Sequence, residues 1–263
     1  MIKFSIITVC LNAGKDVLDT VQNILQQNYD NYELIVKDGF SQDGSLDNLP
    51  NDSHIRLIRK KDKSVYDAMN QGITEATGDF CIFINAGDGL YASNTLQQIA
   101  DFISCNNGDF YYGRSYTIEE NVIRFGPKKM TKNFCYRSTV CHQAMVIKTP
   151  FLKKRGYDCT FGVSADREWM IYAFIEAQMQ FVQIPFIIAN YKGGGISVAK
   201  NSAALIHEED KILKVRYFTK MERTLFAFCE LITLRCIREF INSNPKFRSM
   251  YGRLKYVIVG RKQ

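Results

Sequence analysis

An uninterrupted apolar run, Phe80 to Ile84, limits most strongly how this chain can fold. Its five side chains are aliphatic, aromatic or thiol, which is typical of a parallel strand buried on both faces of a sheet. The chain then turns polar at Asn85, Gly87 and Asp88. A carboxylate therefore follows the carboxyl end of a central strand, where open α/β sheets bind ligands. An ordinary Asn-Gly-Asp turn is the alternative interpretation.

Strands and helices alternate through the first 90 residues. β-branched or apolar segments predict strands at 4–11, 33–36 and 55–58, and amphipathic spacing predicts helices at 16–27 and 64–77. Right-handed crossovers make strands in such an order parallel within one sheet. The chain is therefore predicted to be an α/β protein with a central, mostly parallel sheet flanked by helices.

The pattern is mixed after position 88. Helices are predicted at 95–103 and 166–178, and strands at 109–112, 144–147 and 181–188. Alternating polarity predicts an exposed hairpin arm at 118–125. Three consecutive glycines, at 193–195, are expected to end the compact part of the chain.

Composition indicates a globular protein that is neither secreted nor integral to a membrane. Of the 263 residues, 46% are hydrophobic and 23% are charged, which is typical of soluble domains. The eight cysteines contain no Cys-x-x-Cys pair, so we expect reduced thiols in a cytosolic protein. The first residues run directly into a strand pattern, without a signal peptide. No apolar stretch is long enough to span a bilayer.

Positive charge is concentrated near the end of the chain. From Lys211 onwards there are thirteen Lys/Arg and three Glu, whereas residues 1–210 contain 21 Lys/Arg and 24 Asp/Glu. We therefore predict a domain at 1–205, with a nucleotide-binding half at 1–90 and an acceptor half at 91–205. A basic helical C-terminal extension is predicted at 206–263, and an anionic partner is the simplest reason for its charge.

The apolar helix predicted at 225–241 suggests which anionic partner this is. Lys and Arg flank it on both sides, a pattern that suits peripheral binding to an anionic membrane surface. A helical pair that packs on the first domain, or that forms a homodimer, is the alternative, with the basic residues on a solvated face. Nucleic acid is not expected as a partner, because no recognition motif accompanies the charge.

Six motifs occur along the chain in a fixed order. They are Ser5 to Asn12, Val36 to Ser45, Asp62 to Gly78, Cys141 to Ala144, Ala165 to Glu168, and Gly194 to Ser197. In this combination the chain resembles the nucleotide-sugar glycosyltransferases of family 2, which have the Rossmann-like GT-A fold. The resemblance covers residues 4 to 197 and is to the short, soluble bacterial branch that builds O-antigen, lipopolysaccharide and exopolysaccharide.

The resemblance implies a divalent metal, Mn²⁺ or Mg²⁺, with Asp88 as its ligand. Family members commonly have Asp-x-Asp or Asn-x-Asp-Asp at this turn, whereas this chain has Asn85 and a single carboxylate. Hard cations that clamp diphosphates use one or two carboxylates together with phosphate oxygens. One carboxylate is therefore compatible with metal use.

The donor-binding residues are also implied by the resemblance. Asp38 would contact the base, Thr8, Asn12 and Ser41 would line that end of the cleft, and Lys63 and Asp67 would face the ribose and phosphates. The alternative is that Asp38 and Asp43 are Asx-turn residues and that Lys63 is a solvated lysine.

Asp166 is the candidate general base. An inverting transfer needs a carboxylate that takes the proton of the attacking acceptor hydroxyl. Asp166 or Ser164 could also cap the helix predicted there, and both roles are compatible. His142 and Glu168 are candidates for contact with the acceptor or diphosphate, although a single histidine is more often a packed residue.

These features predict an inverting, metal-dependent enzyme that moves one hexose-type residue from a nucleoside-diphosphate sugar to a lipid-linked saccharide. UDP is the favoured nucleotide and GDP the second. Neither membrane helices nor a Gln-x-x-Arg-Trp motif is present, so a processive synthase is not expected. The expected location is the cytoplasm, at the inner face of the plasma membrane.

Two other functions compete with this one. A non-catalytic nucleotide-sugar-binding or assembly protein is the alternative, because the turn at residues 85–88 has only one carboxylate. A dinucleotide oxidoreductase is disfavoured, because no Gly-x-Gly-x-x-Gly follows the first strand.

Overall fold

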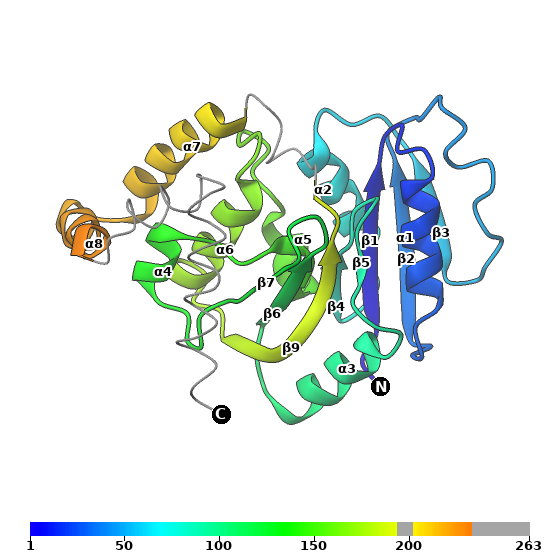
Figure 1. Cartoon of the computed structure of the whole chain (residues 1–263), viewed down its shortest axis with the longest axis horizontal. Helices are drawn as coiled ribbons and strands as arrows, with labels where there is room; N and C mark the ends of the chain where they lie inside the picture. The colour runs from blue at the N-terminus through cyan, green and yellow to red at the C-terminus, as the bar shows by residue number, and fades with distance from the viewer. Residues whose placement is uncertain (194–201, 233–263) are drawn as a thin grey trace. The chain divides into compact units, whose positions relative to one another are not determined.

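The computed structural model describes residues 1–193 and 202–232, and one mixed nine-stranded sheet runs through the described chain (Figure 1). Its strands are β1 (Phe4–Cys10), β2 (Tyr32–Asp38), β3 (Ile55–Arg59), β4 (Phe80–Phe83), β5 (Gly89–Leu90), β6 (Phe110–Thr117), β7 (Val122–Arg124), β8 (Met145–Lys148) and β9 (Phe181–Tyr191). Eight strands follow the order β3-β2-β1-β4-β8-β6-β9-β5, and β7 pairs with β6.

β4 lies in the middle of this order, as the sequence predicts. It pairs in parallel with β1 and antiparallel with β8, and its four residues are all buried. β3, β2, β1 and β4 are mutually parallel. The second half departs from the prediction of a mostly parallel sheet, because β8 is antiparallel to both β4 and β6. β6 and β9, by contrast, pair in parallel, so the second half of the sheet is mixed.

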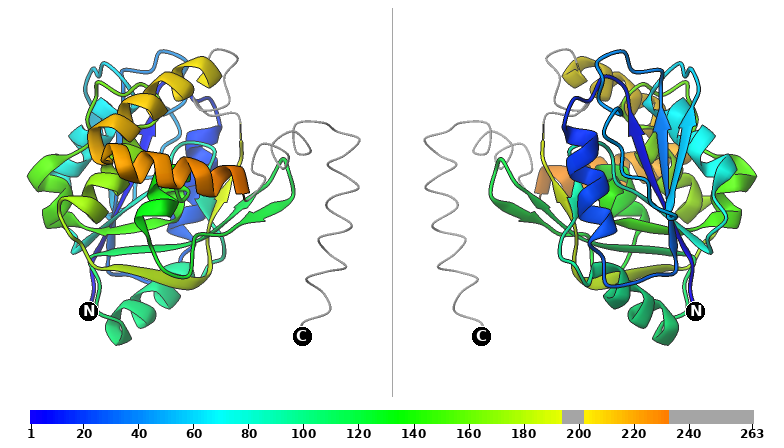
Figure 2. Two further views of the ribbon diagram at one scale, coloured as in Figure 1. Left: turned by 90° about the vertical axis from the view of Figure 1, so that its left-hand side faces the viewer. Right: turned by 90° about the vertical axis from the view of Figure 1, so that its right-hand side faces the viewer.

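Helices cover both faces of the sheet, and Figure 2 shows α1 on one side of the strands and α2 on the other. The helices of the first unit are α1 (Asp16–Leu25), α2 (Val65–Glu75), α3 (Thr95–Cys105), α4 (Lys132–Arg137), α5 (Thr149–Arg155) and α6 (Ala165–Ile175), with a short 3₁₀ turn, η1 (His142–Ala144). Ile6 of β1 belongs to the core formed with α1 and α3. Ile7 faces α2, where it lies against Gly72. Burial on both faces explains why β1 has no polar alternation.

Most predicted elements are present, with shifts of a few residues at their ends. The strand predicted at 109–112 extends to Thr117, and the arm predicted at 118–125 contains β7, whose three residues are all exposed. Several short elements were not predicted: β5, α4, η1 and α5. The glycines at 194–195 and the part of the predicted helix beyond 232 lie outside the described residues.

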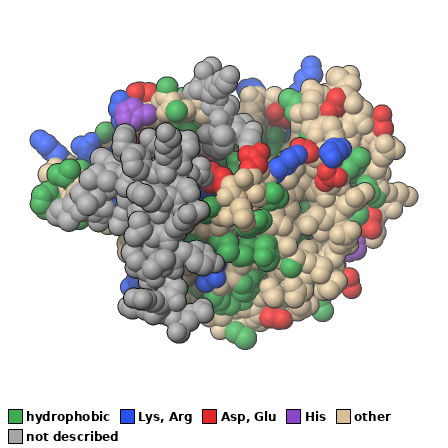
Figure 3. Space-filling model, viewed as in Figure 1, with side chains coloured by type: hydrophobic (Ala, Val, Ile, Leu, Met, Phe, Trp, Pro, Cys, Tyr) green, Lys and Arg blue, Asp and Glu red, His purple; other side chains and the backbone are tan. Residues whose placement is uncertain are grey.

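Contacts divide the chain into two units, Met1–Leu213 and a second that begins at Lys214. The boundary predicted at 205 and 206 remains a prediction. α7 (Ser202–Tyr217) crosses the division, and α8 (Lys220–Ile232) lies within the second unit. Within the described residues, no helix combines the length and apolar character that crossing a bilayer requires. Basic and acidic side chains are interspersed over the N-terminal half on the face seen in Figure 3.

Candidate active site

The turn after β4 is held in place by α1. Gly87 has φ +94°, a left-handed conformation that glycine adopts without steric cost. The Thr20 hydroxyl of α1 accepts from the Gly87 backbone N–H at 3.0 Å and donates to the Asp88 carbonyl at 2.7 Å. The Asp88 N–H donates to the Asn85 carbonyl at 2.9 Å. The apolar strand and its glycine turn thus carry Asp88 to a defined place at the carboxyl edge of the sheet.

Asp88 is buried, and each of its carboxylate oxygens accepts a hydrogen bond. Gln143 Nε2 donates to Oδ2 at 2.7 Å, and the Lys192 backbone N–H donates to Oδ1 at 3.0 Å. Gln143 is itself buried, and its Oε1 accepts from the Cys141 thiol at 2.8 Å. Burial nevertheless raises the pKa of Asp88 above its ordinary value, since these donors only partly offset the loss of water.

His142 connects this turn to the candidate base. Asn85 Nδ2 lies 3.2 Å from His142 Nε2, and His142 Nδ1 lies 3.4 Å from Asp166 Oδ2. With the Asn85 amide as donor, Nε2 is an acceptor and the proton of a neutral imidazole is on Nδ1, facing Asp166. Asn85 Oδ1 is buried and has no hydrogen-bond partner within the part of the chain that the structure describes.

Asp166 lies in the first turn of α6, with its carboxylate turned toward neighbouring elements. Its Oδ1 accepts from the Arg167 N–H at 2.8 Å and lies 3.1 Å from the Tyr66 hydroxyl, which is also 2.6 Å from the Val163 carbonyl. Burial by itself would raise the pKa of Asp166, but hydrogen bonds from His142, Arg167 and Tyr66 outweigh it and hold that pKa below its ordinary value of 3.8. Asp166 is therefore a carboxylate at neutral pH.

Of the two capping candidates for this helix, Asp166 accepts from the first-turn Arg167 N–H, and Glu168 points into the protein interior. The side chain of Ser164, the residue before α6, forms no capping hydrogen bond. Glu168 is fully buried, and its two oxygens accept from Arg155 at 3.0 and 2.6 Å. The expectation that Glu168 contacts acceptor or diphosphate is therefore not supported, because Arg155 and the core occupy its surroundings.

Asp38 forms the centre of a second cluster, at the carboxyl ends of β1 and β2. It has no exposed surface and accepts from the Ser41 N–H at 3.0 Å, the Ser41 hydroxyl at 2.6 Å and Arg59 Nε at 3.0 Å. Burial would raise the pKa of Asp38, but these donors lower it overall. Asn12 is exposed beside this cluster, its N–H donating to Ser41 Oγ at 2.8 Å and its Oδ1 accepting from the Gln42 N–H.

The other predicted donor-binding residues have structural contacts. Thr8 is fully buried and donates to the Ile84 carbonyl at 2.7 Å, so it joins β1 to the end of β4 and offers no surface to a ligand. Asp67 accepts from the Lys63 N–H, while its own N–H donates to Ser64 at the start of α2. The Lys63 side chain is exposed.

The Asx-turn alternative for Asp43 agrees with the structure. Asp43 accepts from the backbone N–H groups of Gly14 and Ser45.

Asn85, Asp88, His142 and Asp166 thus form one connected group, separate from the Asp38 group. Sequence reasoning missed three residues that hold these carboxylates: Tyr66, Gln143 and Arg59. Gln143 belongs to the Cys-His-Gln-Ala motif, which was a signal for it. Across the described ranges, no three His, Cys, Asp or Glu side chains come close enough together to form a metal site unaided.

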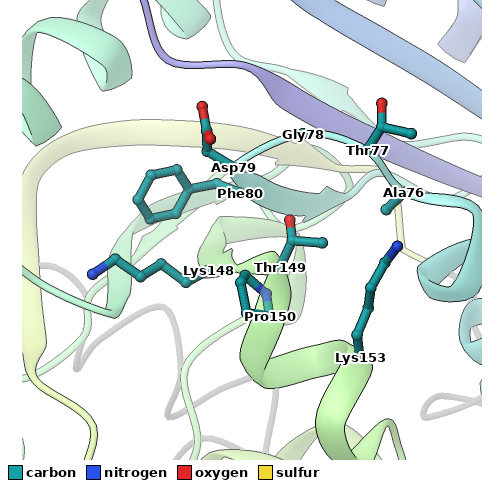
Figure 4. A pocket seen from close by; sticks show the side chains of 9 residues that line it. All are labelled: Ala76, Thr77, Gly78, Asp79, Phe80, Lys148, Thr149, Pro150 and Lys153. Atoms are coloured by element: carbon teal, nitrogen blue, oxygen red, sulfur yellow. The ribbon is translucent and has the colours of Figure 1, made fainter.

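A cavity of about 680 Å³ lies at the amino-terminal end of β4, the opposite end from Asp88 (Figure 4). Its lining includes Thr77, Asp79, Lys148, Thr149 and Lys153. Lys148 is paired with Asp109 at 2.8 Å. The cavity is therefore distinct from the candidate site.

Comparison with known proteins identifies relatives of this chain. The family described as Glycosyl transferase family 2 matches residues 5–201. A relative from Mycobacterium bovis, described as a PGL/p-HBAD biosynthesis glycosyltransferase, is 32% identical over 202 residues, which cover 74% of this chain and 78% of the relative.

Solved structures show a similar fold at low sequence identity. Staphylococcus aureus TarS in complex with UDP has a TM-score of 0.61 at 17% identity, covering 73% of this chain and 60% of the TarS chain. This chain therefore spans less than two thirds of that TarS chain. The mannosyltransferase PcManGT from Pyrobaculum calidifontis, in complex with GDP-Man and Mn²⁺, has a TM-score of 0.59 at 12% identity, covering 97% of this chain and 84% of PcManGT. The likenesses support the predicted fold class.

Proposed function

Because the chain belongs to glycosyl transferase family 2 and is therefore a glycosyltransferase that uses a nucleotide sugar, we propose that it transfers a single hexose-type residue with inversion to a lipid-linked saccharide. The pathway we propose is bacterial surface polysaccharide synthesis, such as O-antigen or exopolysaccharide. A mycobacterial relative is described as a PGL/p-HBAD biosynthesis glycosyltransferase, and this description supports a bacterial glycan pathway.

The observation that carries this proposal is the short turn η1, which joins the two carboxylates. His142 faces Asp166, and the next residue, Gln143, holds Asp88. This 3₁₀ turn thereby connects Asp166 of α6 with the turn at the strand end, where α/β sheets bind ligands. A displacement at an anomeric carbon needs a base for the acceptor close to a turn that binds the diphosphate.

The proposed reaction is a single displacement. The acceptor oxygen bonds to the anomeric carbon as the bond from that carbon to the β-phosphate oxygen breaks, and the nucleoside diphosphate leaves with the bonding electrons. The acceptor proton passes to Asp166. The hydrogen bonds from Arg167 and Tyr66 hold Oδ1, which orients the carboxylate for that transfer.

The residues at the turn are compatible with a divalent cation, Mn²⁺ or Mg²⁺. Asp88 supplies a carboxylate, and the buried, unpartnered Asn85 Oδ1 is the kind of oxygen that hard cations bind. Asp88 and Asn85 would hold the cation, together with donor phosphate oxygens. A bound cation would neutralise charge on the leaving diphosphate.

The second unit supports a peripheral membrane position, at the inner face of the plasma membrane. On α8, exposed apolar side chains recur at helical spacing at Met221, Leu225, Phe228 and Leu231. Lys220 and Arg223 lie on the same helix. A helix that combines an exposed apolar face with basic residues suits an anionic lipid surface, and a lipid-linked acceptor would be found there.

Donor binding and hydrolysis across UDP-, GDP- and dTDP-sugars, with Mn²⁺, Mg²⁺ or EDTA, test the proposed function. We expect one donor to bind selectively and to be hydrolysed slowly, and EDTA to abolish the hydrolysis. UDP is the favoured nucleotide and GDP the second, since TarS and PcManGT are recorded with UDP and GDP-Man. If no donor binds under any metal condition, the proposed function is wrong.

A further inference from the structure

Phe40 adopts a backbone conformation that is unusual for a bulky residue. Its φ is +72°, in the left-handed region that favours glycine. The chain on either side forces this conformation: the Gly39 N–H donates to the Cys10 carbonyl at 3.0 Å, and Ser41 is tied to both Asp38 and Asn12. Such strain costs folding free energy and is concentrated at functional sites.

The side chain of Phe40 is only partly buried. Phe40 is 42% exposed. The guanidinium carbon of Arg59 lies over the ring, 5.6 Å from its centroid. Arg59 is in turn held by Asp38 Oδ2 at 3.0 Å and by the Ser41 carbonyl at 3.2 Å. The ring is thus positioned by a fixed cation, with much of its surface open to solvent.

The exposed surface at this end of the sheet is mixed: it has apolar side chains and the Arg59 guanidinium, and also the polar side chains of Asn12, Gln42 and Asp43. Asp38, the residue expected to contact the base, is completely buried and already accepts from Ser41 and Arg59. Leu11 is 57% exposed, and the Arg59 side chain is 49% exposed. A nucleobase at this end of the sheet could therefore meet the Phe40 ring and the Arg59 guanidinium, whereas the Asp38 carboxylate has no surface to offer it.

We propose that Phe40 stacks on the base of the donor nucleotide, and that Arg59 is a positioning residue for its ring. The inference rests on the proposed function, since it assumes a nucleotide donor. Aromatic side chains bind bases through their faces, which every base possesses. Stacking therefore provides affinity for the nucleoside, while the choice between bases depends on other contacts. This gives a reason why a phenylalanine stands where the backbone favours glycine.

The substitution Phe40→Gly separates this role from a structural one, because it relieves the left-handed strain while it removes the ring. We expect the melting temperature to be unchanged or higher. The dissociation constant of UDP or GDP, whichever binds the wild type more tightly, should rise about 5- to 150-fold, the range that base–aromatic stacking supplies. Binding of inorganic pyrophosphate, which has no base, should be unaffected, and Phe40→Tyr should restore nucleotide binding.

Isothermal titration of the full chain in the presence of Mn²⁺, with thermal unfolding of each variant, provides these measurements. The matched control is Phe125→Gly, which removes an exposed phenylalanine from the loop after β7 and should leave the nucleotide affinity unchanged. Equal nucleotide affinity in Phe40→Gly and the wild type would overturn the inference. An equal loss for pyrophosphate would overturn it too, because the ring would then hold the loop. A wild type that binds no nucleotide overturns the proposed function first.

Discussion

Asp166 receives its donors from three separate elements. The His142 side chain reaches it from η1, the Tyr66 hydroxyl from α2, and the Arg167 N–H from α6 itself. These bonds lower its pKa even though it is largely removed from water. If Asp166 is the base, as we propose, proton acceptance would depend on its orientation and on the timing of bond formation, because a lowered pKa means low intrinsic basicity.

Substitution of Asp166 by Asn should lower kcat by about 10²- to 10⁴-fold, since an amide cannot take the acceptor proton. Donor affinity should remain within a few-fold of the wild type. The exposed Asp101→Asn variant is the control. The pKa of Asp166 is lowered from its ordinary value of 3.8. Protonation of Asp166 should therefore reduce the wild-type rate only as the pH falls below that value. Unchanged turnover in Asp166→Asn would refute the mechanism.

Gln143 supplies a buried hydrogen bond that favours the charged form of Asp88. In Gln143→Leu, Oδ2 of Asp88 loses this bond, so the pKa of Asp88, already raised by burial, should rise further. Mn²⁺ affinity should fall, and more steeply at lower pH, because the metal needs the carboxylate. The unsatisfied oxygen should also cost about 1–3 kcal/mol of stability.

Calorimetric Mn²⁺ titration and urea unfolding measure these two effects of Gln143→Leu. Gln98→Leu, on the exposed side of α3, serves as the matched control. Mn²⁺ affinity that is the same in Gln143→Leu as in the wild type would show that Asp88 does not bind the metal.

Motifs that resemble those of the family were sufficient to single out Asp88, Asp166 and His142 one by one, for separate roles, but not to show that they lie in one connected group. They could not show which carboxylates have accessible surface. Asp38 and Glu168 resemble ligand-binding residues in the sequence, yet Arg59 and Arg155 bind them inside the protein. Such pairing depends on side chains that are distant along the chain, so no local pattern indicates it.

At the scale of elements, the close approach of β1 to the segment before β4 depends on Gly78. A methyl group there would lie 2.6 Å from the Ser5 nitrogen and 2.7 Å from the Phe4 carbonyl carbon. Both are backbone atoms of a central strand, which cannot move away without disturbing the pairing with β2 and β4.

Gly78→Ala should therefore destabilise the fold by about 1–3 kcal/mol, as overpacking does elsewhere. Gly14→Ala is the comparison, because nothing lies within 4 Å of its added methyl and only its φ of +54° opposes the change. We expect a smaller loss in Gly14→Ala when both are measured by urea denaturation. A larger loss in Gly14→Ala would contradict this account.

Long elements were predicted well, and short ones were not. β1 and β2 contain continuous runs of apolar and β-branched residues, and α1, α2 and α3 have apolar residues at helical spacing, so the sequence displays both patterns directly. β5 has only two residues and η1 three, which is too short for a period to appear. Their conformations depend on pairing with β9 and on the chain around Asp88, so only tertiary contacts define them.

At the scale of the whole molecule, Glu33 joins three strands and the loop before β4. Its carboxylate accepts from Ser5 of β1 at 2.6 Å, from Thr77 at 2.6 and 2.8 Å, and from Arg56 of β3 at 2.9 Å. Burial would raise the pKa of Glu33, but these donors outweigh it and lower the pKa from 4.5 to about 2.

When folding lowers the pKa of a carboxyl group, that group stabilises the folded protein at pH values above the pKa it has in the unfolded chain. The stabilisation is lost as the pH falls toward the pKa in the folded protein. The free energy of unfolding should therefore decline between pH 4.5 and about 2, with a contribution from Glu33 on the order of 3 kcal/mol. Urea denaturation at several pH values measures it. Glu33→Gln should show a shallower decline, whereas Glu75→Gln, at the exposed partner of Arg56, should follow the wild type.

The second unit supports a further whole-molecule prediction. The full chain should bind vesicles that contain anionic lipid at low salt and dissociate as salt rises, because screening weakens the attraction. Replacing Leu225 and Phe228 by Ser should weaken binding, since both expose apolar surface on α8. Leu57→Ser, an exposed position on β3, is the control. Binding that ignores both salt and lipid charge would exclude an electrostatic membrane site, and absence of binding would favour the helical-pair or dimer alternative.

The sequence by itself determined the alternation of strands and helices in the first half and the carboxylate turns at the strand ends. Both follow from local periodicity and from the shared direction of parallel strands. Only the tertiary structure decided that the second half of the sheet is mixed, that Gln143 meets Asp88, and that Phe40 is strained and exposed. These features arise from contacts between distant segments and from burial, which no local stretch of sequence encodes.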